Sequence, residues 1–103
     1  MLTSKQRAYL RSLANGIDTI LMVGKGEISD NIIMQADTAL TARELIKGKA
    51  LENSAYSSRE AAELIADKCR AEVVQVIGSK FVLYRRNPDE PKIELPKDTK
   101  KKA

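Results

Sequence analysis

The stretch Met22-Val23-Gly24-Lys25-Gly26-Glu27-Ile28-Ser29 decides the fold of this 103-residue chain. An apolar run from Ile17 to Val23 stops at two glycines that bracket a lysine, and Ser29 then opens a run with helical spacing. We therefore predict a strand that turns through the glycines into a helix. The first N–H groups of such a helix have no partner within it, and the helix dipole adds partial positive charge. Together with the charge of Lys25, this corner is suited to hold a phosphate or another small anion.

The same loop has a second interpretation. Glycines relieve steric crowding in a tight turn between a strand and a helix, whether or not a ligand binds there. The nucleotide-binding motifs do not fit, because a Walker loop needs four residues between its glycines and then Gly-Lys-Ser/Thr. The dinucleotide fingerprint would need a glycine at Ser29. Taken alone, the loop leaves both an anion site and a simple tight turn open.

Hydrophobic spacing predicts three helices and four strands. We expect helices over about 3–14, 29–41 and 57–70, and strands over 17–23, 44–51, 73–77 and 80–84. The first and third helices begin with sequences typical of a capping box, Thr3-Ser4-Lys5-Gln6 and Ser57-Ser58-Arg59-Glu60. Ser29 is a natural N-cap for the second helix.

Turn residues predict how these elements are joined. Asn15-Gly16 is suited to end the first helix with a residue in the left-handed conformation. Gly78-Ser79 is typical of a two-residue hairpin between the last two strands. Ile28 and Ile33 are placed to form a hydrophobic staple around the start of the second helix.

The order of elements, α-β-α-β-α-β-β, predicts a compact two-layer or sandwich α/β domain with a four-stranded mixed sheet. Two strand–helix–strand units require right-handed crossovers and parallel neighbouring strands, and an antiparallel hairpin closes the sheet. We assign residues 1–87 to this domain. Residues 88–103 hold three prolines and end near Lys100-Lys101-Lys102, which predicts a mobile, partly extended basic tail with a short strand around 93–95.

Composition favours a cytoplasmic binding protein over an enzyme. The chain carries 18 Lys and Arg against 14 Asp and Glu, and 13 of those cations against 10 of those acids lie in residues 1–87. It has no histidine and a single cysteine, Cys69, so the usual general base, a zinc site and an internal disulfide are absent from the sequence. We expect no cofactor. No apolar run reaches the length of a membrane span, and Lys5, Arg7 and Arg11 interrupt any signal-peptide core.

Basic residues recur along the chain, and each set has more than one interpretation. The strand over 44–51 places Ile46, Gly48 and Ala50 on one face and Lys47 and Lys49 on the other. Lysines on one face of a strand indicate solvent exposure, an edge protected against aggregation, or contacts to phosphate; the sequence alone favours solvent.

Four segments in fixed order resemble the YhbY-like CRM domain family (chloroplast RNA splicing and ribosome maturation). They are Leu-Thr-Ser-Lys-Gln-Arg-Ala-Tyr-Leu-Arg-Ser-Leu-Ala (2–14), Val-Gly-Lys-Gly (23–26), Glu-Leu-Ile-Lys-Gly-Lys (44–49) and Val-Val-Gln-Val-Ile-Gly-Ser-Lys-Phe-Val-Leu-Tyr-Arg (73–85). The resemblance implies a fold like the C-terminal domain of translation initiation factor three. It also implies RNA binding through a GxxG loop and association with precursors of the large ribosomal subunit. That loop would occupy 24–27, where this chain has Glu27 in place of the last glycine.

Three hypotheses follow from the residues and the resemblance. The first is a monomeric, non-catalytic protein that binds ribosomal RNA by its backbone and shape, because the few aromatics form no base-stacking platform. The second is a protein-binding adaptor whose lysines only solubilise it, and the third is a domain that binds a small anion or a nucleotide. The candidate RNA-binding residues of the first hypothesis are Gly24, Lys25, Gly26, Lys5, Arg7, Arg11, Lys47, Lys49, Arg85 and Arg86.

Overall fold

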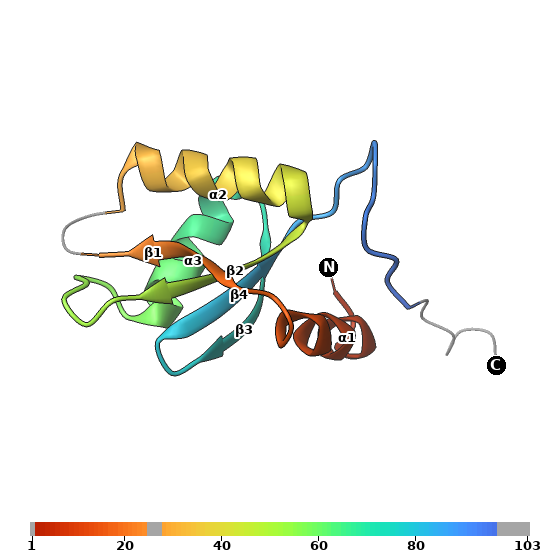
Figure 1. The fold of residues 1–103 in the computed structure, drawn as a ribbon, viewed down its shortest axis with the longest axis horizontal. Coiled ribbons are helices and arrows are strands. Elements are labelled where there is room, and N and C mark those ends of the chain that lie inside the picture. Colours follow the sequence, from red (N-terminus) through yellow and green to blue (C-terminus); the bar gives the residue numbers. More distant parts are fainter. Residues whose placement is uncertain (1, 25–27, 97–103) are drawn as a thin grey trace.

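The computed structural model describes residues 2–24 and 28–96. Its elements follow the predicted order. They are α1 (Ser4–Ala14), β1 (Thr19–Val23), α2 (Asp30–Arg43), β2 (Leu45–Ala50), α3 (Ser58–Cys69), β3 (Glu72–Ile77) and β4 (Lys80–Tyr84). The strands form one mixed sheet with α2 and α3 on one face and α1 on the other (Figure 1). The predicted α/β fold with a four-stranded mixed sheet is confirmed.

The helices begin with the predicted capping chemistry. At α1, the hydroxyl of Thr3 accepts the N–H of Gln6, and the Gln6 side chain accepts the N–H of Thr3, both at 3.1 Å. Ser57 and Glu60 form the same reciprocal pair at α3. Ser29 caps α2 as expected. The sequence therefore sets where each helix starts.

The ends of the helices are less predictable. Neither Asn15 nor Gly16 adopts the left-handed conformation, so that expectation is wrong; Gly16 instead closes a tighter turn by donating its N–H to the Leu13 carbonyl at 3.1 Å. Among the described residues, a positive φ occurs at two that are not glycine, Glu44 with φ 66° and Arg70 with φ 59°. A side chain at such a φ costs about 1–2 kcal/mol, so surrounding contacts must hold it there.

The sheet has the strand order β1-β2-β4-β3, and its second half departs from the prediction. β1 and β2 are parallel neighbours as expected, but β4 lies between β2 and β3 and is antiparallel to both. The expectation that both strand–helix–strand units give parallel neighbours is therefore wrong for the second unit. The physical reason is the burial of Phe81, Val82, Leu83 and Tyr84, because a strand buried on both faces belongs in the interior of a sheet.

The core lies on both faces of the sheet. On the face covered by α2 and α3, which we call the α2/α3 face, Ile46, Phe81 and Leu83 pack against the two helices. On the other face, the α1 face, the cluster is smaller and joins residues of α1 to residues of β2, β3 and β4. Its buried members are Leu10, Ala14, Leu45, Val74, Val82 and Tyr84.

Glu44 fixes the segment that follows β4. Its side chain is fully buried, and its carboxylate accepts the N–H groups of Asn87, Lys92 and Ile93, each at 2.7 Å. Ile93 also packs against the α1-face core. The strand expected around 93–95 does not form. The domain boundary at residue 87 stays a prediction, and residues 97–103 lie outside the described part of the chain.

Candidate functional site

β1 leads toward the predicted loop at one end of the sheet, which we call the loop end. β1 stops there at Val23 and β2 at Ala50, because parallel strands finish at the same edge. The hairpin between β3 and β4 reaches the same end. The N–H of Ala50 donates to the Ser79 carbonyl at 2.8 Å, and the hydroxyl of Ser58 donates to the Gly78 carbonyl at 2.7 Å. The loop end therefore gathers Gly24, the β2–α3 connection and the hairpin.

Gly24 is the part of the predicted glycine-lysine-glycine loop that the structure describes; Lys25, Gly26 and Glu27 lie outside the described residues. A Cβ atom added at Gly24 would lie 3.5 Å from the Cδ1 atom of Leu51, an ordinary contact, and the backbone of Gly24 is not left-handed. The turn therefore does not require glycine at this position. Steric relief, the alternative interpretation of the loop, does not explain Gly24.

The N-terminus of α2 opens onto the loop end. The hydroxyl of Ser29 accepts the N–H of Ile32 at 3.4 Å, which satisfies one of the first donors of the helix. Ile28 and Ile33, the predicted staple, both pack against the core of the α2/α3 face. A helix of 14 residues presents the positive end of its dipole at this point. This end of α2 therefore carries the partial positive charge of the dipole, with the carboxylate of Asp30 in its first turn.

Lys47 and Lys49 lie on the α1 face of β2, as the alternation predicted, with half-buried side chains. The register places Lys80 of β4 directly opposite Lys49. Sequence reasoning missed Lys80, although its place beside the hairpin was a usable signal. Lys47, Lys49 and Lys80 form no ion pair with another described residue. The loop end thus carries cations that the fold does not neutralise.

The basic residues of α1 lie elsewhere. Figure 1 shows α1 and the C-terminal end of β1 at opposite ends of the sheet. Lys5 is exposed and Arg11 is half-buried, whereas the guanidinium of Arg7 donates to the carbonyls of Val73 and Val74 on β3. Arg7 therefore ties α1 to the sheet. The structure does not bring the basic residues of α1 together with the loop.

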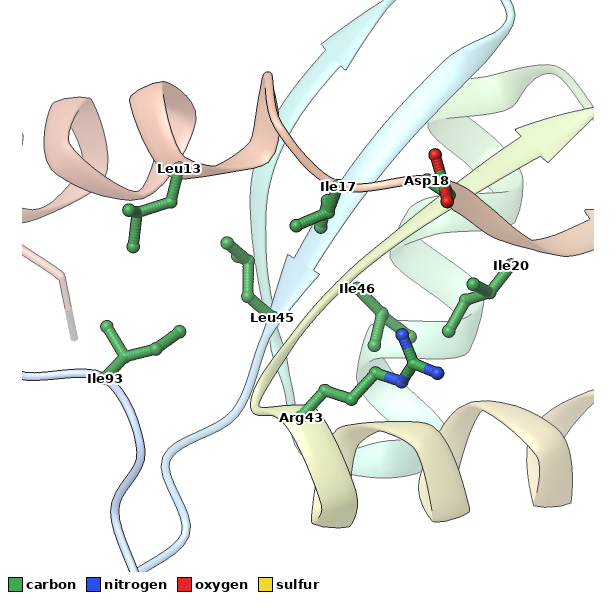
Figure 2. Close-up of a pocket in the computed structure, with 8 residues that line it drawn as sticks. All are labelled: Leu13, Ile17, Asp18, Ile20, Arg43, Leu45, Ile46 and Ile93. Carbon is green, nitrogen blue, oxygen red and sulfur yellow. The ribbon is translucent and has the colours of Figure 1, made fainter.

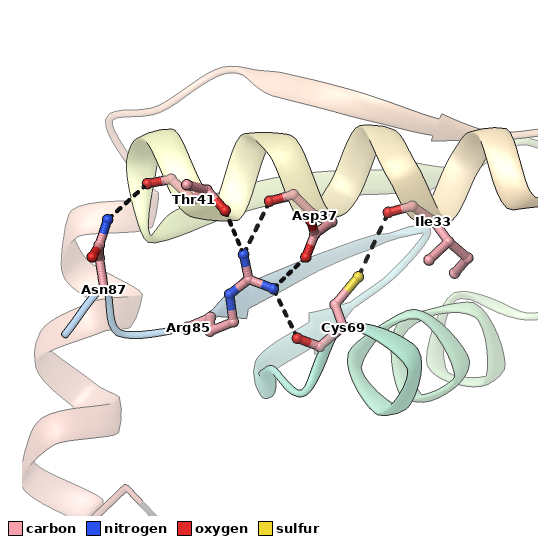
Figure 3. A network of polar contacts seen from close by, with 6 residues as sticks. All are labelled: Ile33, Asp37, Thr41, Cys69, Arg85 and Asn87. Carbon is pink, nitrogen blue, oxygen red and sulfur yellow. Dashed lines mark hydrogen bonds and ion pairs between the residues drawn. The ribbon is translucent and has the colours of Figure 1, made fainter. Parts of the chain in front are cut away.

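Arg85 also has a structural position (Figure 3). Its guanidinium donates to the carboxylate of Asp37 at 2.6 Å, to the hydroxyl of Thr41 at 2.7 Å and to the carbonyl of Cys69 at 2.9 Å. It donates further to the Asp37 carbonyl at 3.0 Å. These contacts join α2 to the end of α3. The Arg85 guanidinium therefore binds groups of the protein itself.

Arg86, the next residue, is exposed. With Gln6 and Lys92 it lines a polar pocket of about 580 Å³ beneath the segment that Glu44 holds. The floor of this pocket includes Tyr84, whose buried hydroxyl has no hydrogen-bond partner among the described residues. Arg86 is thus accessible, but it lies at the end of β4 that is remote from the loop end.

A second pocket, of about 320 Å³, lies where the end of α1 meets the sheet (Figure 2). Its walls are mainly aliphatic, from Leu13, Ile17 and Leu45 to Ile93 on the opposite side. Asp18 and Arg43 are its charged residues. An aliphatic hollow with one carboxylate and one guanidinium offers neither an activated nucleophile nor a metal-binding set.

The described residues contain no cluster of His, Cys, Asp and Glu that could hold a metal ion. Burial, with the charge of Asp37 as a smaller contribution, raises the pKa of the Cys69 thiol above its usual value. A thiol with a raised pKa is a poor nucleophile near neutral pH. Within the described part of the chain, no helix is both long and apolar enough to span a membrane.

Comparison with known proteins identifies the family. The CRS1 / YhbY (CRM) domain model matches residues 2–85. The "Probable RNA-binding protein YqeI" of Bacillus subtilis is 44% identical over 93% of this chain and 100% of its own length. An "RNA-binding protein" of Haemophilus influenzae is 34% identical over 93% of this chain and 96% of its own length.

A solved structure agrees with these relatives. The solution structure of the hypothetical protein SAV1595 from Staphylococcus aureus, described as a putative RNA binding protein, has a TM-score of 0.77 and 50% sequence identity. The match covers 93% of this chain and 100% of that one. The family resemblance that the four sequence segments indicated is confirmed. The chain belongs to the CRS1 / YhbY (CRM) domain family.

Proposed function

We propose that this chain is a non-catalytic RNA-binding protein of the cytoplasm that acts as a monomer on structured ribosomal RNA during assembly of the large ribosomal subunit. The observation that carries the proposal is the meeting of two features at the loop end. β1 ends and α2 begins at this end of the sheet, and Lys49 and Lys80, on the α1 face at the same end, have no ion-pair partner among the described residues. The names of the relatives support binding to RNA, and the family resemblance supplies the ribosomal target.

In this proposal, each part of the loop end has a separate role. Gly24 and Gly26 let the backbone approach a phosphate, and Lys25 neutralises it. The N-terminus of α2 adds the partial charge of its dipole. Lys47 and Lys49 extend the contact along β2.

The remaining predicted basic residues fall into two groups, according to whether their side chains bind other groups of the protein. Lys5, Arg11 and Arg86 can reach a large RNA that extends past the sheet, because none of them has a hydrogen bond or ion pair among the described residues. Arg7 and Arg85 are left out of the proposed interface, because their guanidinium groups bind carbonyls of the protein itself.

Titration of RNA affinity against salt tests the loop. A protein that neutralises phosphates releases counterions, so the logarithm of its affinity falls linearly with the logarithm of salt concentration. We expect Lys25→Ala to weaken binding of a ribosomal RNA fragment and to reduce the slope by about 1. Lys68→Ala, which removes an exposed lysine on α3, is the matched control. Unchanged affinity and slope in Lys25→Ala would contradict the loop assignment.

Sedimentation tests the cellular role and the adaptor alternative. The tagged chain is sedimented from bacterial lysate at low and raised salt, with and without ribonuclease. The proposal expects migration with precursors of the large subunit that is lost when salt is raised or RNA is cut. Comigration that survives both treatments would support the protein-binding adaptor instead.

A further inference from the structure

α1 covers only part of its face of the sheet. Leu10 and Ala14 pack on the half nearest Leu45 and Tyr84, away from the loop end. The other half is uncovered among the described residues. It carries a row of side chains that crosses all four strands, one from each: Met22, Lys49, Lys80 and Ile77.

The register shows that the row lies on one face. Met22 pairs with Lys49, Lys49 with Lys80, and Lys80 with Ile77. Side chains of residues paired across neighbouring strands point to the same side of the sheet. Lys47 lies two residues from Lys49 on the same face, roughly 7 Å along the strand. We call this surface, made of Met22, Lys47, Lys49, Lys80 and Ile77, the open half.

The open half is unusual for a surface that only faces water. Two lysines directly opposite each other repel, and a cross-strand pair of like charges is destabilising. The nearest carboxylate in sequence, Glu52, borders a shallow hollow with Lys49 but forms no ion pair with it. Met22 and Ile77 are 50% and 62% exposed, so two large apolar side chains flank the lysines.

Protection of the sheet edges does not explain these residues. Lysines that guard against aggregation belong on edge strands. Here Lys49 and Lys80 lie on the two central strands, β2 and β4, and the exposed apolar residues lie on the edge strands β1 and β3. A sheet protected against aggregation would have the lysines on its edge strands, whereas here the edge strands carry the exposed apolar residues. A partner that is both anionic and partly apolar fits it better than water does.

We infer that the open half binds an unpaired segment of RNA. This inference rests on the proposed function and extends it from the loop to the sheet. Lys47, Lys49 and Lys80 contact phosphates, while Met22 and Ile77 contact the faces of unstacked bases. Only a single strand presents phosphates and exposed base faces together, because a duplex keeps its bases stacked inside. Met22 is two residues before Gly24, so the open half begins beside the glycine that follows β1.

The test compares two RNAs and matched charge variants. The full chain is titrated with a fluorescent oligouridylate of 12 nucleotides and with a blunt RNA duplex of equal charge, at several salt concentrations. Lys49→Gln/Lys80→Gln removes two charges from the open half. Lys68→Gln/Lys92→Gln, at two exposed positions elsewhere, removes the same net charge and is the control.

We expect wild type to prefer the single strand and the open-half variant to lose at least tenfold in affinity for it. The slope of log affinity against log salt should fall by about 1.4, since each phosphate contact on a single strand contributes about 0.7. The control variant should change affinity less than twofold. The melting temperature of Lys49→Gln/Lys80→Gln should stay the same or rise, because a repulsive pair is removed. A second variant, Met22→Ser/Ile77→Ser, should lower affinity without changing the slope.

Several results would overturn the inference. If Lys49→Gln/Lys80→Gln binds RNA like wild type while Lys25→Ala does not, the open half does not bind RNA and the proposed function stands. Preference for the duplex would also refute the single-stranded ligand. Displacement of the oligonucleotide by polyglutamate at equal charge would identify a surface for acidic protein segments. If wild type binds neither RNA, the proposed function and this inference both fail.

Discussion

At one end of the sheet, the carboxylate of Glu44 accepts three backbone N–H groups and the guanidinium of Arg85 makes four hydrogen bonds. At the loop end, Lys49 and Lys80 face each other without an ion-pair partner among the described residues. The charged groups of Arg85 and Glu44 at the first end form hydrogen bonds that hold the helices and the C-terminal segment in place. The charges of the second end stabilise nothing that the structure describes, so they are available to a partner.

This contrast shows that the charge of a residue does not by itself identify a binding surface. Arg85 and Arg86 are adjacent in sequence and look equivalent there, yet one is bound inside the protein and the other is exposed. Variants that remove charge at one end should therefore change stability, and those at the other end should change binding. The following predictions test that separation, from the largest expected effect on stability to the smallest.

Glu44→Ala should destabilise the protein by about 3 kcal/mol. Three backbone N–H groups lose a charged acceptor, and hydrogen bonds to charged groups are worth about 1.5–3 kcal/mol each, part of which water restores when the segment loosens. Urea unfolding measures the change. Glu44→Gln retains one acceptor oxygen and should lose about half as much. A Glu44→Ala protein as stable as wild type would show that this carboxylate does not hold the segment.

Arg85→Ala should cost about 1–2 kcal/mol, whereas Arg86→Ala should stay within about 0.5 kcal/mol of wild type. Removal of the Arg85 guanidinium leaves the Cys69 carbonyl without this donor and breaks the link between α2 and α3 (Figure 3). Arg86 is exposed and has no such contacts. Thermal unfolding of the two variants side by side gives the difference. Equal losses would mean that the Arg85 contacts contribute little in solution.

Tyr84→Phe should leave stability near neutral pH unchanged or slightly higher, because the buried Tyr84 hydroxyl has no hydrogen-bond partner among the described residues. Burial, and secondly the charge of Glu44, raise the pKa of Tyr84 above its usual 10.0. The unfolded chain therefore ionises first as pH rises above about 10, and the folded state loses stability there. Urea unfolding between pH 8 and 11 should show a steeper loss for wild type than for Tyr84→Phe. Parallel curves would contradict the raised pKa.

The sequence predicted the local chemistry well and the long-range contacts poorly. Thr3, Ser29 and Ser57 cap helices as expected, because a capping bond spans three residues and is visible in the sequence. The place of β4 in the sheet and the partners of Glu44 were missed, because both depend on residues more than 30 positions away. Spacing predicted Lys49 on its face of β2, but only the register could reveal Lys80 opposite it.

Two glycines, Gly24 after the end of β1 and Gly48 within β2, give the smallest and sharpest test. Gly24→Ala should change stability by less than about 0.5 kcal/mol, because the new Cβ lies 3.5 Å from Leu51 in an ordinary contact. Gly48→Ala is the contrasting control: its Cβ would lie 2.4 Å from Cζ of the buried Phe81, an overlap that costs about 1–3 kcal/mol. Urea unfolding separates the two.

RNA titration of the same pair then decides why Gly24 is a glycine. If its role is to let a phosphate approach the backbone, Gly24→Ala should weaken binding while the fold stays intact. If Gly24 has no role in binding, affinity should be unchanged, and the loop end would have to rely on Lys25, Lys49 and Lys80. A stable Gly24→Ala protein that binds RNA like wild type would therefore move the proposed interface from the loop to the open half of the sheet.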